Sequence, residues 1–100
     1  SSGPEFESMK IKDNKIILTF TGTGGGLTTK DGEAPKQFAI KGSEGKYEWA
    51  NAEIHGNKLI VFSEKVTHPV AVRYAWSDNP EGANLQNLEG LPAYPFTTEY

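Results

Sequence analysis

Two histidines are the only side chains in this 100-residue sequence that ordinarily serve as general bases near neutral pH. His55 falls in a predicted hairpin turn and His68 directly precedes a proline, and both kinds of place are normally exposed to solvent. Ser63 lies near His68 in the sequence, but a strand end and a loop do not imply a hydrogen bond between them. The chain contains no G-x-S-x-G motif and no Asp followed three positions later by His. Nucleophilic catalysis needs a base and an orienting group within reach of the nucleophile, so we predict no catalytic residue in this chain.

A glycine-rich stretch, Gly22 to Gly26, suggests a phosphate-binding loop. Such a loop needs a Lys-Ser/Thr pair and a following helix, whose backbone N–H groups meet the phosphates. Here the following residues, Leu27 to Lys30, reverse that order and no helical pattern follows. Cysteine is absent, which excludes disulfides and thiolate ligands, and the carboxylates and histidines show no metal-ligand spacing. The sequence therefore predicts neither a metal site nor a cofactor.

Aromatic side chains are the remaining chemical resource. A flat ring can cover the apolar face of a pyranose while its polar edge stays in water. Alternatively, Trp49, Tyr74 and Trp76 belong to the hydrophobic core. Arg73 is predicted to face away from Tyr74 and Trp76, where it either anchors a ligand or pairs with a carboxylate. The candidate substrate-binding residues are Tyr47, Trp49, Arg73 and Tyr94.

Length and composition indicate one small domain. The chain has 36% hydrophobic and 11% aromatic residues, so a few large rings must supply much of the burial. A net charge of -3 with mixed signs gives no electrostatic footprint for nucleic acid or an anionic membrane, and no apolar run is long enough to span a bilayer. We therefore expect neither a nucleic-acid nor a membrane partner. Residues 1–7 resemble an expression-vector remnant, which leaves residues 8–100 as the expected domain.

Short strands with alternating polarity and frequent turns fill the chain. A repeated I-x-x-N-K-[IL]-I-[LV] pattern at Ile11–Leu18 and Ile54–Val61 predicts two similar β-hairpins. No window has convincing helical periodicity. Because several short antiparallel strands need a second layer, the pattern predicts an all-β fold, a small antiparallel sandwich of jelly-roll-like type. The predicted strands span residues 9–12, 15–21, 37–41, 46–54, 58–63 and 70–76.

The stretch from Pro69 to Phe96 organises the rest. It begins as a strand that places Val70, Val72, Tyr74 and Trp76 on one face, and it continues as an Asn/Gly/Pro-rich extended C-terminal arm. Propensity alone does not explain why such an arm should be fixed, so we expect it to lie across another surface.

This same stretch resembles a known family. It is similar to the C-terminal segment of sialate O-acetylesterase-type carbohydrate esterases, which are relatives of the SGNH hydrolases, and the likeness extends over nearly everything after Glu7. The motifs that carry it are Val72-Arg73-Tyr74-Ala75-Trp76, Asn79-Pro80, Asn84-Leu85, Asn87, Glu89-Gly90-Leu91-Pro92 and Pro95-Phe96-Thr97.

The resemblance implies a parent enzyme that removes acetyl esters from sugars with a Ser-His-Asp arrangement and no metal. It places the catalytic Ser and Asp-x-x-His blocks N-terminal to this segment, so the fragment alone would be inert. It also implies a periplasmic or secreted location. Two roles stay open. The chain is either an accessory domain that packs against the esterase domain, or a carbohydrate-binding module that presents exposed aromatics to acetylated glycans.

Overall fold

Two adjacent hairpins form one half of the molecule in the computed structural model, which describes residues 2–99. Both follow the repeated sequence pattern, and their second strands pair with each other, giving the antiparallel order β1-β2-β7-β6. The first turn residue of each hairpin has a positive φ, 55° at Asp13 and 66° at Gly56, which Asp and Gly tolerate well. The predicted pair of hairpins is therefore confirmed. Their strands are β1 (Glu5–Lys12), β2 (Lys15–Thr21), β6 (Asn51–His55) and β7 (Lys58–Phe62).

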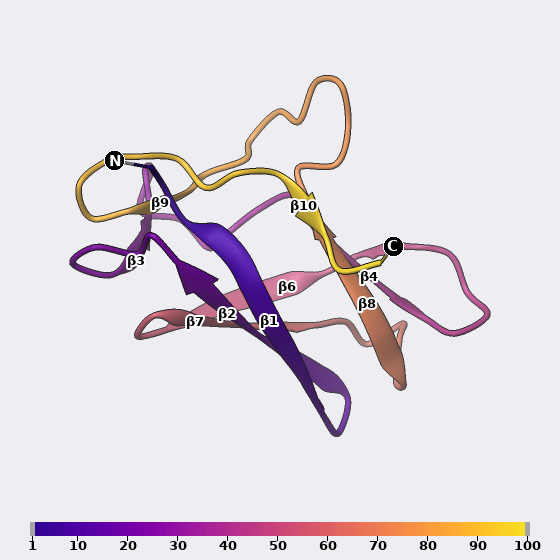
Figure 1. The fold of residues 1–100 in the computed structure, drawn as a ribbon. Coiled ribbons are helices and arrows are strands. Elements are labelled where there is room, and N and C mark those ends of the chain that lie inside the picture. Colours follow the sequence, from indigo (N-terminus) through magenta and orange to yellow (C-terminus); the bar gives the residue numbers. More distant parts are fainter. Residues whose placement is uncertain (1, 100) are drawn as a thin grey trace.

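A second four-stranded antiparallel sheet covers the first, and the fold is an all-β sandwich (Figure 1). Its order is β10-β8-β4-β5, with β2 lying against β8 and β4 against β7. A small third sheet closes one end. Within residues 2–99 no helix is long and apolar enough to cross a membrane. The remaining strands are β3 (Leu27–Thr29), β4 (Phe38–Gly42), β5 (Glu48–Trp49), β8 (Pro69–Tyr74), β9 (Leu85–Asn87) and β10 (Phe96–Thr97).

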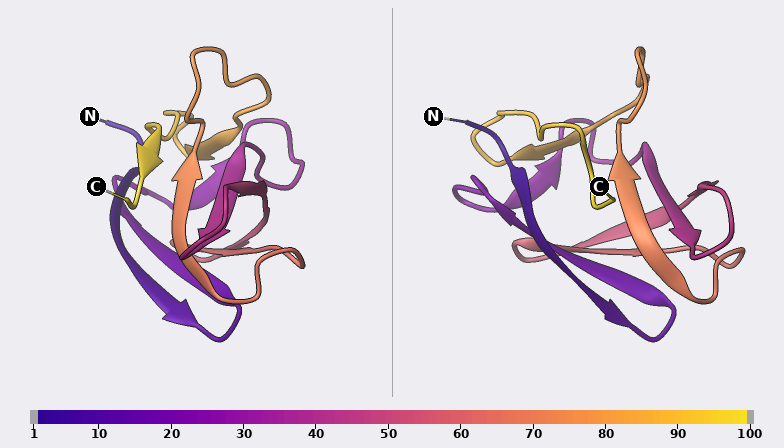
Figure 2. Two further views of the ribbon diagram at one scale, coloured as in Figure 1. Left: turned by 90° about the vertical axis from the view of Figure 1, so that its right-hand side faces the viewer. Right: turned by 45° about the vertical axis from the view of Figure 1, so that its right-hand side comes forward.

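The core lies between the inner faces of the two large sheets, where Figure 2 shows β1 and β2 diverging from β8. On one face of β2, β4 and β7 the alternating apolar residues point inward and are buried, whereas Ile11 on β1 is 48% exposed. Aromatic contacts join the layers, because the Phe96 ring of the second sheet lies 5.0 Å from Phe6 and 5.7 Å from Phe20 of the first sheet, between ring centroids. These inward residues are Ile16, Leu18, Phe20, Phe38, Ile40, Leu59 and Val61.

The structure divides one of the predicted strands into two separate strands. The expected continuous strand over residues 46–54 breaks at Ala50, whose N–H donates to the carbonyl of Phe38 at 2.9 Å. The residues before it, β5, pair with β4 in one sheet, and those after it, β6, pair with β7 in the other. Alternation cannot reveal this, since a strand that changes sheets keeps its apolar spacing. Trp49 and Asn51 consequently belong to different sheets.

The predicted C-terminal arm is held by buried polar contacts. Asn84 is 2% exposed, and its side chain accepts from the N–H of Lys36 at 2.8 Å. The same side chain donates to Asp31 and to the carbonyl of Ala34, both at 3.0 Å. One asparagine thereby satisfies three groups of the segment that follows β3. A buried amide with all its partners fixes a loop that apolar packing alone would leave loose.

A second buried asparagine fixes the next turn of the arm. The Asn87 side chain donates to the carbonyl of Gly22 at 3.1 Å and accepts from the N–H of Leu91 at 2.9 Å. Between the two asparagines, the Tyr74 hydroxyl accepts from the N–H of Leu85 at 3.1 Å. Burial raises the pKa of Tyr74, so this hydroxyl stays protonated. The arm is thus ordered as β9, a turn and β10.

Residues 4–7 belong to the fold, although the sequence pattern set residues 1–7 apart; that residues 1–7 come from an expression vector stays a prediction. The strand β1 begins at Glu5, and Pro4 is fully buried. The Phe6 ring stacks on Phe96 with centroids 5.0 Å apart and planes 6° from parallel. The carbonyl of Pro4 accepts from the N–H of Tyr94 at 3.0 Å. A single apolar residue in a polar stretch gave no periodicity from which to infer this strand.

We predict that Phe6→Ala lowers the free energy of unfolding by about 2 kcal/mol, because it removes a stacked, half-buried ring. Deletion of residues 1–6 should cost at least as much. Urea titration followed by tryptophan fluorescence measures both. Glu7→Ala, an exposed position of the same strand, is the matched control and should stay within about 0.5 kcal/mol of the parent chain. Equal stability of the full and shortened chains would place the segment outside the folding unit.

Candidate functional site

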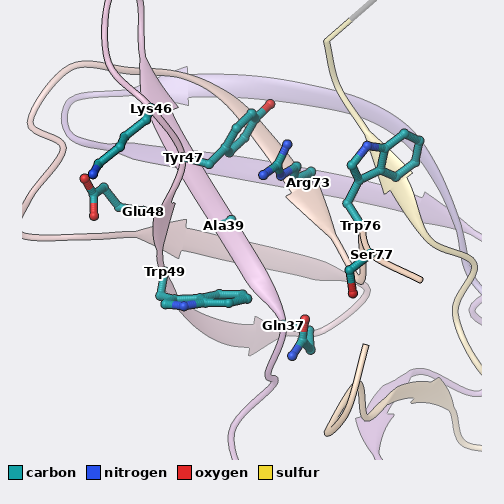
Figure 3. A pocket seen from close by; sticks show the side chains of 9 residues that line it. All are labelled: Gln37, Ala39, Lys46, Tyr47, Glu48, Trp49, Arg73, Trp76 and Ser77. Atoms are coloured by element: carbon teal, nitrogen blue, oxygen red, sulfur yellow. The ribbon is translucent and has the colours of Figure 1, made fainter. Parts of the chain in front are cut away.

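A hollow of about 350 Å³ opens on the outer side of β4, at the ends of β5 and β8 (Figure 3). This volume lies at the low end of the range of small-molecule sites, about 300–1,000 Å³. The hollow brings together three of the four sequence-predicted site residues. Its walls and floor consist of Gln37, Ala39, Lys46, Tyr47, Glu48, Trp49, Arg73, Trp76 and Ser77.

Trp49 forms one wall. It lies on the two-residue edge strand β5, opposite Ala39 on β4, and its side chain is 71% exposed. The alternative that Trp49 is core is therefore wrong. The small side chain of Ala39 leaves space beneath the indole, so a large ring stands beside an open floor. An indole this exposed leaves a large apolar surface in contact with water, and it does so beside a second exposed indole at the same hollow.

Trp76 forms the opposite side, so the alternative that places it in the core is wrong for this residue too. The strand β8 ends at Tyr74 because Ala75 has a φ of 53°, a left-handed conformation that L residues rarely adopt. The N–H of Ala75 donates to the carbonyl of Gln37, a residue that is also in the left-handed region, with a φ of 71°. The alternation of β8 is lost at this point, and Trp76 is 50% exposed. Its position directly before a Ser-Asp-Asn-Pro loop was the one sequence signal against a core role.

A cation, Arg73, lines the hollow next to Tyr47 and Trp76 (Figure 3). The Arg73 guanidinium carbon lies 3.9 Å above the centroid of the Tyr47 ring, a cation–π stack. The Tyr47 hydroxyl donates to Glu99 at 3.1 Å, and Glu99 pairs with Lys41 at 2.7 Å. Burial raises the pKa of Tyr47, while the Lys41 ammonium lowers the pKa of Glu99. The tyrosine is therefore neutral and the glutamate ionised near pH 7, which fixes the ring under the arginine.

The fourth predicted site residue, Tyr94, lies elsewhere. It is 49% exposed on the arm, where its N–H bonds to Pro4, and it is not among the residues that line the hollow. The aromatic residues thus do not form the one platform that the sequence suggested. In Figure 3 the Trp49 ring is seen edge-on while the Trp76 ring shows its face, so the two indoles border a hollow rather than a plane.

The remaining polar candidates lie outside the hollow. His55 faces Glu53 at 3.4 Å in an exposed hairpin, and His68 faces the neighbouring Thr67 at 3.2 Å. The Ser63 hydroxyl accepts from the N–H of Lys65 within its own turn. No group of three or more histidine, aspartate or glutamate side chains in residues 2–99 could hold a metal ion.

The glycine-rich loop is occupied by the chain's own carboxylate. Both Glu89 carboxylate oxygens accept from the N–H of Gly25, at 3.2 and 3.1 Å. A Cβ on Gly24 would collide with the same carboxylate. The loop therefore binds an anion that the arm supplies, and its glycines serve that contact.

The chain is therefore a β-sandwich domain with an aromatic-lined hollow, and a known protein contains a similar domain. No family model matches the chain, and no curated protein sequence does. Among solved structures it is similar to a carbohydrate acetylesterase from Xanthomonas citri, with 41% identity and a TM-score of 0.93. The match covers 98% of this chain and 23% of that one. The chain thus corresponds, over almost its whole length, to about a quarter of a larger carbohydrate acetylesterase.

The Lys41–Glu99–Tyr47 chain of contacts predicts a pH dependence. Because the folded-state pKa of Glu99 is depressed, its contribution to stability is present above the unfolded-state pKa and is lost as pH falls through the folded one. In an NMR titration of its carboxyl carbon, Glu99 should titrate below its ordinary range, and Lys41→Gln should raise that pKa. Lys65→Gln, which removes a cation elsewhere, should leave it unchanged. An ordinary pKa in the parent chain would contradict the ion pair.

Proposed function

We propose that this chain is a non-catalytic accessory β-domain of a carbohydrate acetylesterase, and that it packs against the esterase domain of its parent. One observation carries the proposal. At 41% identity, almost the entire chain matches a quarter of a carbohydrate acetylesterase, which leaves most of that enzyme outside the match. The described residues agree with a supporting role, since both histidines are exposed and their side-chain contacts are with close neighbours in the sequence, His55 with Glu53 and His68 with Thr67.

The arm offers a surface for that packing. Two of its large apolar side chains are exposed, Leu88 at 61% and Tyr94 at 49%. The backbone between them is fixed by the buried Asn87, so the surface is organised before any partner binds. A preorganised surface loses little conformational entropy on association. We therefore assign residues 79–96 to the contact with the esterase domain.

The finer identity of the parent is part of the same proposal. The R-Y-A-W and E-G-L-P motifs support a sialate O-acetylesterase-type enzyme of the SGNH class that acts in the periplasm or outside the cell. In such an enzyme the Ser and Asp-x-x-His blocks belong to the esterase domain, and this chain contributes neither.

A domain exchange tests the accessory role. The chain alone should not hydrolyse p-nitrophenyl acetate above background, whereas the Xanthomonas citri enzyme should keep its activity when this chain replaces its matching segment. Deletion of that segment should lower soluble, active enzyme more than tenfold, because it exposes the packing surface. An unrelated β-sandwich domain of the same size is the control insert and should not restore the loss. Turnover by the purified chain, or full activity after deletion, would overturn the proposal.

The exposed indoles favour a second candidate function, carbohydrate binding. Trp49 and Trp76 border one hollow beside Arg73 and Tyr47, and the similar Xanthomonas citri protein is a carbohydrate acetylesterase. Aromatic rings with polar groups at their edges suit sugar rings, which have apolar faces and hydroxyl rims. This function is compatible with the accessory role, since the hollow and the arm use different residues.

NMR titration with oligosaccharides from acetylated xylan and acetylated pectin, each before and after de-acetylation, tests sugar binding. At millimolar sugar we expect shifts of the Trp49 and Trp76 indole N–H signals, and at least a tenfold weaker affinity in Trp49→Ala. Tyr94→Ala removes an exposed ring outside the hollow and should bind as the parent chain does. Unchanged indole signals with every sugar would remove the candidate, as would a loss in Tyr94→Ala equal to that in Trp49→Ala.

A further inference from the structure

We propose that the hollow between Trp49 and Trp76 selects sugars that carry a carboxylate, and that Arg73 is the group that recognises it. The inference rests on the carbohydrate-binding function proposed above and adds the chemical class of the ligand. It follows from how the guanidinium is held, which charges surround it, and what stands on either side.

The guanidinium is positioned with its hydrogen-bonding edges uncommitted. Its central carbon lies over the Tyr47 ring, 3.9 Å from the centroid, and a cation–π contact of this kind does not itself engage the guanidinium N–H groups with an acceptor oxygen. Among residues 2–99, no carboxylate lies within 4.0 Å of it and no side-chain hydrogen bond from it is formed. A planar fork of donors matches the two oxygens of a carboxylate, and charge-assisted pairs of this kind are the strong ones.

The carboxylate that holds Tyr47 in place is paired with a different cation. Glu99 accepts from the Tyr47 hydroxyl and pairs directly with Lys41 at 2.7 Å, whereas Arg73 forms no such pair with it and adds only a smaller charge effect that also lowers the pKa of Glu99. Lys46 and Glu48, two residues apart in the sequence, both line the hollow, and their opposite charges offset each other. The local set thus holds three cations and two carboxylates, a surplus of one positive charge on a chain whose net charge is -3. A positive spot on an acidic protein favours an anionic ligand over a neutral one.

The two indoles indicate that the carboxylate belongs to a larger molecule with an apolar ring face. Trp49 and Trp76 border the hollow beside the guanidinium, with exposed fractions of 71% and 50%. A small inorganic anion would leave both rings uncovered, whereas a sugar acid brings an apolar ring face together with its carboxylate. The side chain of Ala39, which forms the floor of the hollow, is small and leaves room for that ring. Arg73 therefore supplies selectivity and the indoles supply contact area.

Two glycosides that differ only at one carbon test the inference. Methyl α-D-glucuronide carries a carboxylate where methyl α-D-glucoside carries a hydroxymethyl group. Titrated by NMR at pH 7 and low salt, the glucuronide should bind about tenfold more tightly, as one charge-assisted pair allows. Arg73→Gln should abolish that difference without weakening the glucoside. Arg73→Lys should keep only part of it, because an ammonium lacks the planar fork. Lys58→Gln, an exposed cation on β7, is the matched control and should keep the full difference.

The outcomes separate the two proposals. If both glycosides shift the indole signals equally, and Arg73→Gln changes neither affinity, carboxylate recognition is overturned while sugar binding stands. If neither glycoside shifts them, sugar binding in the hollow falls and this inference with it. The accessory role is tested independently by the domain exchange. Dispersed amide spectra of each variant establish that lost affinity is not lost structure, and Arg73→Lys provides a second measurement if Arg73→Gln fails to fold.

Discussion

The left-handed backbone at Ala75 is the constraint on which the site and the arm both depend. A residue at φ 53° costs free energy for any side chain with a Cβ, and here it is held by a hydrogen bond to Gln37, itself at 71°. Because the strand alternation ends there, Trp76 turns outward instead of joining the core. The chain then leaves the sheet and begins the arm. One local distortion thus creates a wall of the hollow and releases the segment that closes the sandwich.

The arm is stable because its polar groups are satisfied where water cannot reach them. Asn84 and Asn87, each 2% exposed, bond to backbone groups from distant parts of the chain. Leaving one such buried group without a partner costs about 1–3 kcal/mol, a large fraction of the stability of a domain this small. The arm therefore needs few apolar residues, which explains how a segment rich in Asn, Gly and Pro can be fixed without a long strand.

The sequence predicted what repeats and what alternates. The duplicated hairpin pattern and the inward faces, such as Ile16 and Leu18 in β2, were recoverable because each strand there stays in one sheet. The sheet change at Ala50 and the left-handed conformation at Ala75 were not, since both involve backbone contacts with residues distant in sequence, Phe38 at the start of β4 and Gln37 just before it. The same cause limited how many residues of the hollow could be predicted from the sequence. Tyr47, Trp49 and Arg73 were identified by type, but Trp76 was assigned to the core from a periodicity that had already ended.

The sugar binding proposed for the hollow would give the proposed accessory domain a reason to be attached to an esterase. A hollow that holds a glycan weakly would still raise the local sugar concentration at a catalytic site joined to it, because tethering turns a second encounter into an intramolecular one. The geometry suits this use. The hollow is formed by β4, β5 and the end of β8, whereas the exposed Leu88 and Tyr94 lie on the arm. Docking through the arm would leave the lining residues of the hollow uncovered, so one small sandwich can hold the enzyme with one surface and its polymer with another.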